Sequence, residues 1–489
     1  MKKTVCLLLT AVFVLSAVLF SASVSASGLK GDVDKSGEVN NKDVVLLFRY
    51  LSTNEELPSD YDINGDGKVN NKDVTVLFRK MCGYDTDETG ELDLPSTVLL
   101  NSVEYNEKGN YTYFDDDDFK AKLSAFSNKM FSMSAKNENG NYTVSPLSAY
   151  MALAILNAVG DDEVKSDIET LFGMTQEDIE KTKKLFLSLV KEISFEDSLI
   201  SKLDLTNTVW IDSNREANKK TLDMLAEKLF CYAHSTPFAM DNDEANKAIR
   251  EFIAEKTRGL IDTDFDLDAD TVFAIINTLY LKDVWGDEAL ETEKRTFHSA
   301  GKETEKEFLI TEYVPGEIAE TRSSYYFSVR TENGYKVKLI LPKDGVTLKQ
   351  AMSESALNVI NSRKSYVQEH EDGIQRYTRC IFPKFRIESE TDMDKILAEN
   401  GYLGNAFTGY TSNLLAGSFA VSDIIHKAVV NVDEKGVEGA AVTIIVSKET
   451  AIPLPDKKYC TDFVLDREFG FIITTYDDVI LFEGTVVDP

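Results

Sequence analysis

The stretch Asp433–Ser447, DEKGVEGAAVTIIVS, decides the fold that we expect for this chain. After Gly436 the side chains are small or β-branched, no proline occurs, and only one charge interrupts them. Such a segment fits poorly on a surface but well inside a β-sheet. Strand-like runs flank it at 428–432 and 463–465, and the polar, proline-bearing stretch 448–458 follows it directly. The pattern predicts a long exposed loop that is able to become a strand.

The first residues have the composition of a secretory leader. Lys2 and Lys3 precede an apolar run over 5–20, and Val-Ser-Ala ends at Ala26. This pattern predicts a signal peptide over 1–26, since the run is short for a membrane anchor and no basic stop follows it. We therefore expect a secreted, extracellular protein.

Composition excludes several classes of function. With 489 residues and 43% hydrophobic content the chain can hold a large core, and its formal charge is −30. Such acidity opposes binding to nucleic acid or to anionic membranes and favours a soluble protein, which we expect to be monomeric by itself. The cysteines beyond the leader are widely spaced, so we expect free thiols. They are Cys82, Cys231, Cys380 and Cys460.

Two near copies of one motif follow the leader, GDVDKSGEVNNKDVVLLFR from Gly31 and YDINGDGKVNNKDVTVLFR from Tyr61. Each has oxygen-bearing side chains at loop positions one, three, five, nine and twelve and a glycine at six, the spacing of a calcium loop. The sequence therefore predicts two Ca²⁺ ions. The expected ligands are Asp32, Asp34, Ser36, Asn40 and Asp43 in the first loop, and Asp62, Asn64, Asp66, Asn70 and Asp73 in the second.

An apolar helical pattern follows each loop, and no convincing helix precedes the first. This arrangement, with Asp instead of Glu at position twelve, resembles a type I dockerin over residues 31–83. The resemblance implies calcium-dependent folding and binding to a cohesin domain of a scaffoldin, in a cellulosome-like complex that is free or attached to the cell surface. The implied cohesin-binding residues are Asn41, Lys42 and Arg49, mirrored by Asn71, Lys72 and Arg79. Because the two faces are nearly identical, we expect that cohesin is able to bind either way round.

Residues 84–112 are polar and acidic and lack sustained periodicity, which predicts an extended linker. An alternative is that Ser96–Val103 pairs with the sheet of the next domain. The run Asp115–Asp118 then suits the N-terminus of a helix, because negative charge there favours the helix dipole.

Residues 113–489 combine early helical patterns with later strands, which predicts one α+β domain. The expected helices are 119–134, 145–159, 175–193 and 243–256. The expected strands are 205–211, 272–281, 336–341, 380–387, 471–475 and 479–482.

Eight segments in order over this domain resemble the serpin family. They are TVSPLSAYMALAILNAVG, NTVWIDSN, IREFIAEKTRGLI, FAIINTLYLKDVW, ILPKDG, FPKFRI, VSDIIHKAVVNVDEKGVEGAAVT and DREFGFIITTYDDVILFEGTVVDP. The resemblance implies three β-sheets, about nine helices and an exposed reactive loop. A serine or cysteine protease cleaves this loop, which then inserts into the main sheet and traps the acylated enzyme.

The loop residues suit insertion. If Val437 points inward, the residues at 439, 441, 443, 445 and 447 also do, and none of them is charged. The resemblance assigns the hinge and places the reactive bond at Thr450-Ala451, which favours a protease with a small apolar pocket. Lys448 is the alternative, for a trypsin-like protease. The hinge residues are Glu434, Gly436, Val437, Glu438, Gly439, Ala440 and Ala441.

The resemblance also implies a sheet-opening cluster of Ser145, Ser148, Asn277 and His426, with Trp285 and Glu434 at the end of the sheet where insertion begins. We expect no catalytic residues and no cofactor in this domain. Two alternatives to an inhibitor are a non-inhibitory serpin, acting as a structural or decoy-substrate component, and a hydrolase. The uncharged inward-facing set that begins at Val437 disfavours the first, and the lack of a GxSxG motif disfavours the second.

Overall fold

The computed structural model of the chain divides into two compact units, Met1–Pro95 and Ser96–Pro489, and each is treated by itself. None of the helices described is long and apolar enough to cross a membrane. The structure describes residues 30–37, 39–52, 61–63, 67–69, 73, 74, 77, 97–103, 114–193, 202–262, 264, 266–286, 289–299, 301–362, 375–419, 424–437 and 457–489.

The small unit is built around the helix α2, Asn41–Ser52. Its buried side chains form a small core with apolar side chains outside this helix, because apolar residues recur at helical spacing on one side of α2. The core residues are Val33, Val44, Leu47, Ile63 and Leu77.

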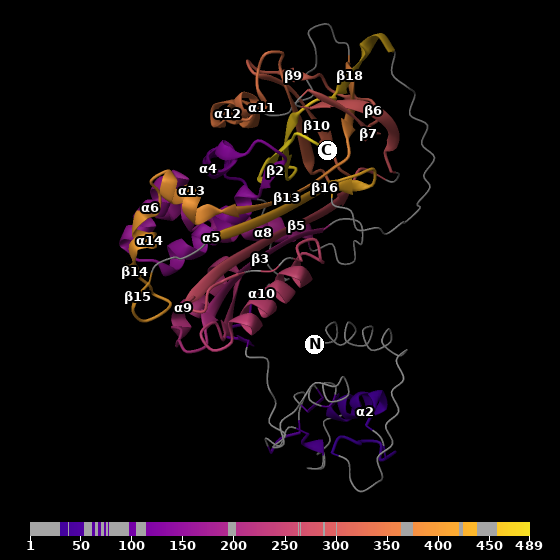
Figure 1. The fold of residues 1–489 in the computed structure, drawn as a ribbon. Helices are drawn as coiled ribbons and strands as arrows, with labels where there is room; N and C mark the ends of the chain where they lie inside the picture. The colour runs from indigo at the N-terminus through magenta and orange to yellow at the C-terminus, as the bar shows by residue number, and fades with distance from the viewer. Residues whose placement is uncertain are drawn as a thin grey trace. The chain divides into compact units, whose positions relative to one another are not determined.

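The described part of the large unit contains three main sheets and one small sheet (Figure 1). The main sheet has the spatial order β1 (Val98–Leu99), β4 (Cys231–Thr236), β3 (Lys202–Asp212), β5 (Phe273–Val284), β17 (Gly436–Val437), β16 (Ile425–Val432) and β13 (Phe385–Asp392). The second has the order β2 (Tyr142–Val144), β20 (Ile480–Val486), β19 (Phe469–Thr474), β11 (Lys336–Pro342), β10 (Ser324–Arg330) and β9 (Ala319–Glu320). The third contains β18 (Cys460–Val464), β12 (Tyr377–Pro383), β7 (Lys302–Ile310), β6 (Glu291–Ser299) and β8 (Val314–Pro315), and the small one β14 (Tyr410–Thr411) and β15 (Ser418–Phe419).

Helices cover both faces of the main sheet (Figure 1). On one face α10 packs on Trp210 and Val429, and on the other α5 joins the larger core that contains Val430. The alternation follows from the pleat, which directs successive side chains to opposite faces. The helices are α4 (Asp117–Ser134), α5 (Pro146–Val159), α6 (Asp162–Phe172), α7 (Gln176–Ile179), α8 (Thr182–Ile193), α9 (Lys219–Leu229), α10 (Asn242–Lys256), α11 (Leu348–Ala351), α12 (Glu354–Ser362), α13 (Met393–Glu399) and α14 (Gly404–Thr408).

The α+β prediction is confirmed, with two corrections to single elements. The helix expected over 175–193 is two helices, α7 and α8, and the Thr182 hydroxyl donates to the Ile179 carbonyl between them at 2.6 Å. The strand expected over 380–387 is also divided, because β12 and β13 belong to different sheets and separate at Lys384. Apolar periodicity continues across both breaks, so it gave no signal for either.

Part of the expected linker is a strand of the large unit. Val98 and Leu99 pair with Ser235 and His234 at the edge of β4. Nearby, Asn101 donates to the Cys231 carbonyl at 3.0 Å and accepts from the Ala233 amide at 2.9 Å. Residues 97–103 are therefore not a free spacer, and the pairing considered as the alternative is the arrangement found.

Candidate functional site

The two residues of β17 lie between β5 and β16 in the main sheet. Gly436 pairs with Val284, and Val437 pairs with Asp283 on one side and Val432 on the other. Val437 is buried, with 3% of its surface exposed, and belongs to the large core. The sheet order places β5 and β16 on opposite sides of β17, and the described residues give these two strands no direct pairing. The hinge therefore fills one end of a gap in the sheet.

Backbone contact explains why a glycine begins β17. A Cβ atom at Gly436 would lie 1.9 Å from the Asp283 carbonyl oxygen, a distance that no side chain tolerates. Any other residue would therefore push β17 away from β5. The hinge role of Gly436 stays a prediction.

The turn before β17 is fixed on both sides. The Trp285 indole donates to the Asp433 carbonyl at 2.7 Å, and the Leu290 amide donates to the Glu434 carbonyl at 2.7 Å. Lys384 forms ion pairs with Glu434 at 2.8 Å and Glu307 at 3.0 Å. Lys384 holds the pKa of the Glu434 carboxyl below its usual range. Sequence reasoning missed Lys384 as the partner of Glu434.

Four of the residues predicted to act in sheet opening lie together. The Ser145 amide donates to His426 Nε2 at 3.0 Å, and the Ser148 hydroxyl donates to the Asn277 carbonyl at 3.4 Å. Ser145 also caps α5 by accepting from the Ser148 amide at 3.3 Å. Burial lowers the pKa of His426 to about 4, so its imidazole is neutral at physiological pH. Trp285 is not in this group, because it lies at the hinge with its ring 6.1 Å from that of Phe382.

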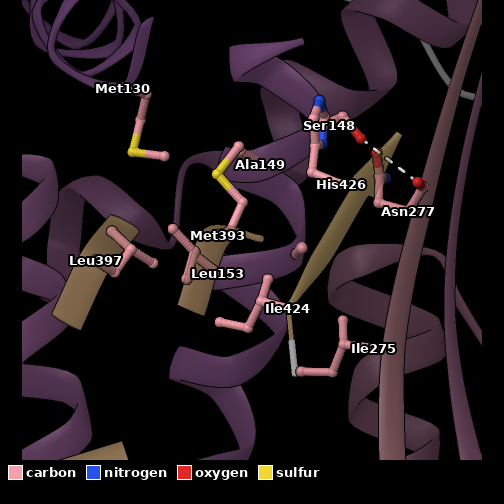
Figure 2. A pocket seen from close by; sticks show the side chains of 11 residues that line it. Met130, Ser148, Ala149, Leu153, Ile275, Asn277, Met393, Leu397, Ile424 and His426 are labelled. Atoms are coloured by element: carbon pink, nitrogen blue, oxygen red, sulfur yellow. Dashed lines mark hydrogen bonds between the residues drawn. The ribbon is translucent and has the colours of Figure 1, made fainter. Parts of the chain in front are cut away.

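A small cavity adjoins this cluster, and residues of α4, α5, β5, α13 and β16 are among those that line it (Figure 2). Asn277 donates through Nδ2 to the Thr206 carbonyl at 3.2 Å and to the Asn207 side chain, which sequence reasoning missed. Its Oδ1 is buried and has no hydrogen-bond partner within the described part of the chain. The cavity is thus polar on the side shown with Ser148, Asn277 and His426. Elsewhere it is apolar, lined by Met130, Leu153, Ile275, Met393, Leu397 and Ile424.

The first loop of the small unit is folded as a cation site. Carboxylate oxygens of Asp32, Asp34 and Asp43 lie within 4.8 Å of one another. Asp43 accepts from the Asp34 amide at 2.9 Å and the Asn40 amide at 2.8 Å, which folds the loop around it. Gly37 has φ +89°, the sharp turn required at position six. Clustered hard oxygens in such a loop fit Ca²⁺.

In the second loop, the residues that the structure describes are arranged as in the first loop. Asp73 accepts from the Ile63 amide at 2.7 Å, and Asp62 accepts from the Gly67 amide at 2.8 Å. Gly67 has φ +82°, as Gly37 does. The remaining predicted ligands Asn64, Asp66 and Asn70 lie outside the described residues.

Several other predicted positions also lie outside the described residues. They are the signal peptide, Glu438, Gly439, Ala440, Ala441, Thr450, Ala451, Asn71, Lys72, Arg79 and Cys82. Of the other cysteines, Cys231 and Cys380 are buried free thiols, and Cys460 is half-buried.

The Serpin (serine protease inhibitor) family model matches residues 121–489. The chain belongs to the serpin family. A dockerin type I domain model matches residues 30–81, so a dockerin precedes the serpin domain. Dockerin type I domains are known to bind calcium, which agrees with the loop geometry.

Known serpins are similar to this chain over most of their length. Alpha-1-antitrypsin 1-3 of Mus musculus is 26% identical over 373 residues, which cover 72% of this chain and 85% of that protein. The putative serpin-Z12 of Oryza sativa subsp. japonica is 23% identical over 378 residues, covering 71% and 85%. The native-state structure of Tengpin, a thermophilic serpin, has a TM-score of 0.63 at 23% identity, covering 76% of this chain and 95% of that one. The structural similarity to Tengpin shows that this chain contains the serpin fold.

Proposed function

We propose that this chain is a secreted suicide-type protease inhibitor that its dockerin attaches to a cohesin-bearing scaffoldin. The observation that carries the inhibitory part is β17, because the first hinge residues occupy a strand position between β5 and β16. Insertion of the following loop would continue this strand. The protease, still attached as an acyl-enzyme at the cleaved bond, would be carried along the sheet.

The register of β17 specifies where each loop residue would go. Continued six residues beyond Val437, it places Thr443 between Asn277 and His426. Two residues further it places Ile445 between Ile275 and Ile424. These four strand residues line the cavity. The gap therefore has a polar position for the threonine and an apolar one for the isoleucine.

The observed burial of Val437 sets which face enters the core. Because side chains alternate along a strand, in the inserted strand Thr443 and Ile445 would share the inner face with Val437, while Glu438 and Lys448 would face outward. The Thr443 hydroxyl would then lie next to Asn277 Oδ1, a buried acceptor that has no hydrogen-bond partner within the described part of the chain. A hydrogen bond between these two groups would favour the inserted state.

The proposed reactive bond is Thr450-Ala451. From Val437 to Thr450 an inserted strand extends roughly 45 Å, which spans the length of β5. A threonine before the bond favours serine proteases with a small apolar specificity pocket, and cysteine proteases of similar preference are the second candidates.

A panel of elastase-like, subtilisin-like, trypsin-like and cysteine proteases tests the inhibitory proposal. We expect a denaturant-resistant band at the summed mass of serpin and protease with at least one small-pocket enzyme. Loop cleavage by every enzyme without such a band would contradict inhibition and support a decoy substrate. Mass spectrometry of the released C-terminal fragment locates the bond, and cleavage after Lys448 would contradict Thr450-Ala451.

Thermal unfolding of the cleaved form supplies a second readout that needs no target enzyme. Insertion adds a paired strand to the sheet, so the loop-cleaved protein is expected to unfold at a much higher temperature than the intact one. An unchanged midpoint after verified cleavage would contradict insertion itself.

The dockerin supports the docking part of the proposal. Calcium held by Asp32, Asp34 and Asp43 would fix the loop that leads into α2, which carries Lys42 and Arg49. Calorimetry with a panel of type I cohesins tests docking, with chelator as the control. Binding that persists without calcium would contradict the proposed dependence.

A further inference from the structure

The exposed face of α2 carries one apolar residue between two cations. Val45 has 40% of its surface exposed, whereas the other apolar side chains of this helix are buried or half-buried. Lys42 and Arg49 are exposed as well, at spacings of three and four residues from Val45. At about 100° per residue these three side chains fall within an arc of roughly 60°. We name Lys42, Val45 and Arg49 the α2 stripe.

Comparison of the two repeats shows which residues both copies share and which residue of the α2 stripe occurs only in the first. Buried residues recur in both copies, as Asp43 and Leu47 do at Asp73 and Leu77. Exposed cations such as Lys42 and Arg49 contribute little to folding, yet both recur in the sequence at Lys72 and Arg79. The apolar member does not recur, because the second copy has Thr75 in place of Val45.

We infer that Val45 makes the first repeat the preferred docking face, so that cohesin binds mainly in one of its two orientations. This inference rests on the proposed docking function. The occupant that fits the α2 stripe is a cohesin surface with an apolar patch between carboxylates, since the patch would bury Val45 while the carboxylates pair with Lys42 and Arg49. At the equivalent position Thr75 would bring a hydroxyl to the same patch, and burial of an unpaired hydroxyl opposes binding.

Two competing orientations give a specific pattern of affinities, because their association constants add. If Val45 favours its orientation about tenfold, Val45→Thr leaves two weak orientations and lowers affinity about fivefold. Thr75→Val creates two strong orientations and raises affinity about twofold. The exchanged variant, Val45→Thr with Thr75→Val, has one strong and one weak orientation again, so its affinity returns to the wild-type value.

Removal of the cations identifies the orientation. In the wild-type chain, Lys42→Ala with Arg49→Ala is expected to weaken binding about tenfold, and Lys72→Ala with Arg79→Ala to change it less than twofold. In the exchanged variant these two effects should trade places. A residue that acts only on folding would not produce this reversal.

The experiment is calorimetry of the full chain in calcium against a purified type I cohesin that binds the wild type. Calcium-dependent circular dichroism of each variant confirms that the exposed substitutions leave the unit folded. An unchanged affinity for Val45→Thr, or an exchanged variant no stronger than Val45→Thr, overturns the inference. Failure of the proposed docking function is a different result, in which the wild-type chain binds no cohesin of the panel.

Discussion

The two ends of the gap between β5 and β16 differ in what they already contain. At the hinge end, Val437 is paired on both sides and its side chain is buried. At the cavity end, Asn277 Oδ1 has no partner among the residues described, and the cavity lies beside it. The strand position between β5 and β16 is therefore occupied by β17 at one end, and at the other end it adjoins a cavity with a buried acceptor. Under the proposed mechanism, insertion would start from the existing pairing of Val437 and would end beside the buried Asn277 acceptor.

The largest expected effect comes from a charge at the filled end. Val437→Glu would bury an unpaired carboxylate on the inner face, at a cost of about 3–5 kcal/mol. We expect the variant to lose denaturant-resistant complexes and to be cleaved as a substrate. The measurement is the ratio of complex to cleaved serpin on a denaturing gel. The matched control is Glu438→Lys on the outer face, and equal complex yields for the two variants would contradict the proposed alternation.

A buried acceptor outside the gap sharpens the comparison. Glu483 on β20 is fully buried, and neither carboxylate oxygen has a partner within the described chain. Burial raises the pKa of Glu483 to about 8, although Lys338 opposes the rise. The folded state therefore holds this proton while the unfolded state releases it, and stability falls as pH rises from about 4.5 to 8.

Glu483→Gln is accordingly expected to stabilise the folded chain by roughly 2–3 kcal/mol at pH 7 and to flatten that pH dependence. Denaturant unfolding between pH 5 and 8 measures both effects. Because Glu483 lies outside the gap, the same gain is expected in the loop-cleaved form. A gain confined to the intact form would show that this site also responds to insertion.

The next effect concerns the cavity end. Thr443→Val keeps the shape of the side chain but removes the hydroxyl expected to reach Asn277 Oδ1. The acceptor would then stay unpaired after insertion, at a cost of about 1–2 kcal/mol, so inserted-state stability should fall by that amount. Urea unfolding of the cleaved form measures this loss, and the outward substitution Val442→Thr is the control. Equal losses for both variants would contradict the register that we extended from β17.

The smallest expected effect is at Lys384. Both of its ion-pair partners, Glu434 and Glu307, are partly exposed, so removal of the cation should cost less than about 1 kcal/mol. Lys384→Met is therefore expected to alter the rate of complex formation by less than about threefold. Stopped-flow measurements at low and high salt test this. Because salt screens the charge, the rates of the wild type and of Lys384→Met should become more similar at high salt. A larger change that persists in high salt would assign Lys384 a role beyond charge pairing.

Local chemistry explains which elements the sequence predicted well. The helices α4, α5 and α10 were predicted within two residues of their bounds, because acidic or serine caps and apolar spacing mark them. The division at Lys384 was not predictable, since β12 and β13 carry similar alternation and differ only in the sheet that each joins. The strand β1 was likewise ambiguous, because two paired residues leave almost no periodic signal.

The sequence by itself determined the chemistry of both modules: oxygen ligands at calcium-loop spacing, and an uncharged alternating segment after Gly436. These are local properties, fixed by the order of side chains along the chain. Only the tertiary structure decided that Val437 is already paired, that Lys384 holds Glu434, and that Asn277 presents an unpaired acceptor beside a cavity. Each of these depends on strands that are distant in sequence and adjacent in the sheet, and their register is set by the packing of the whole domain.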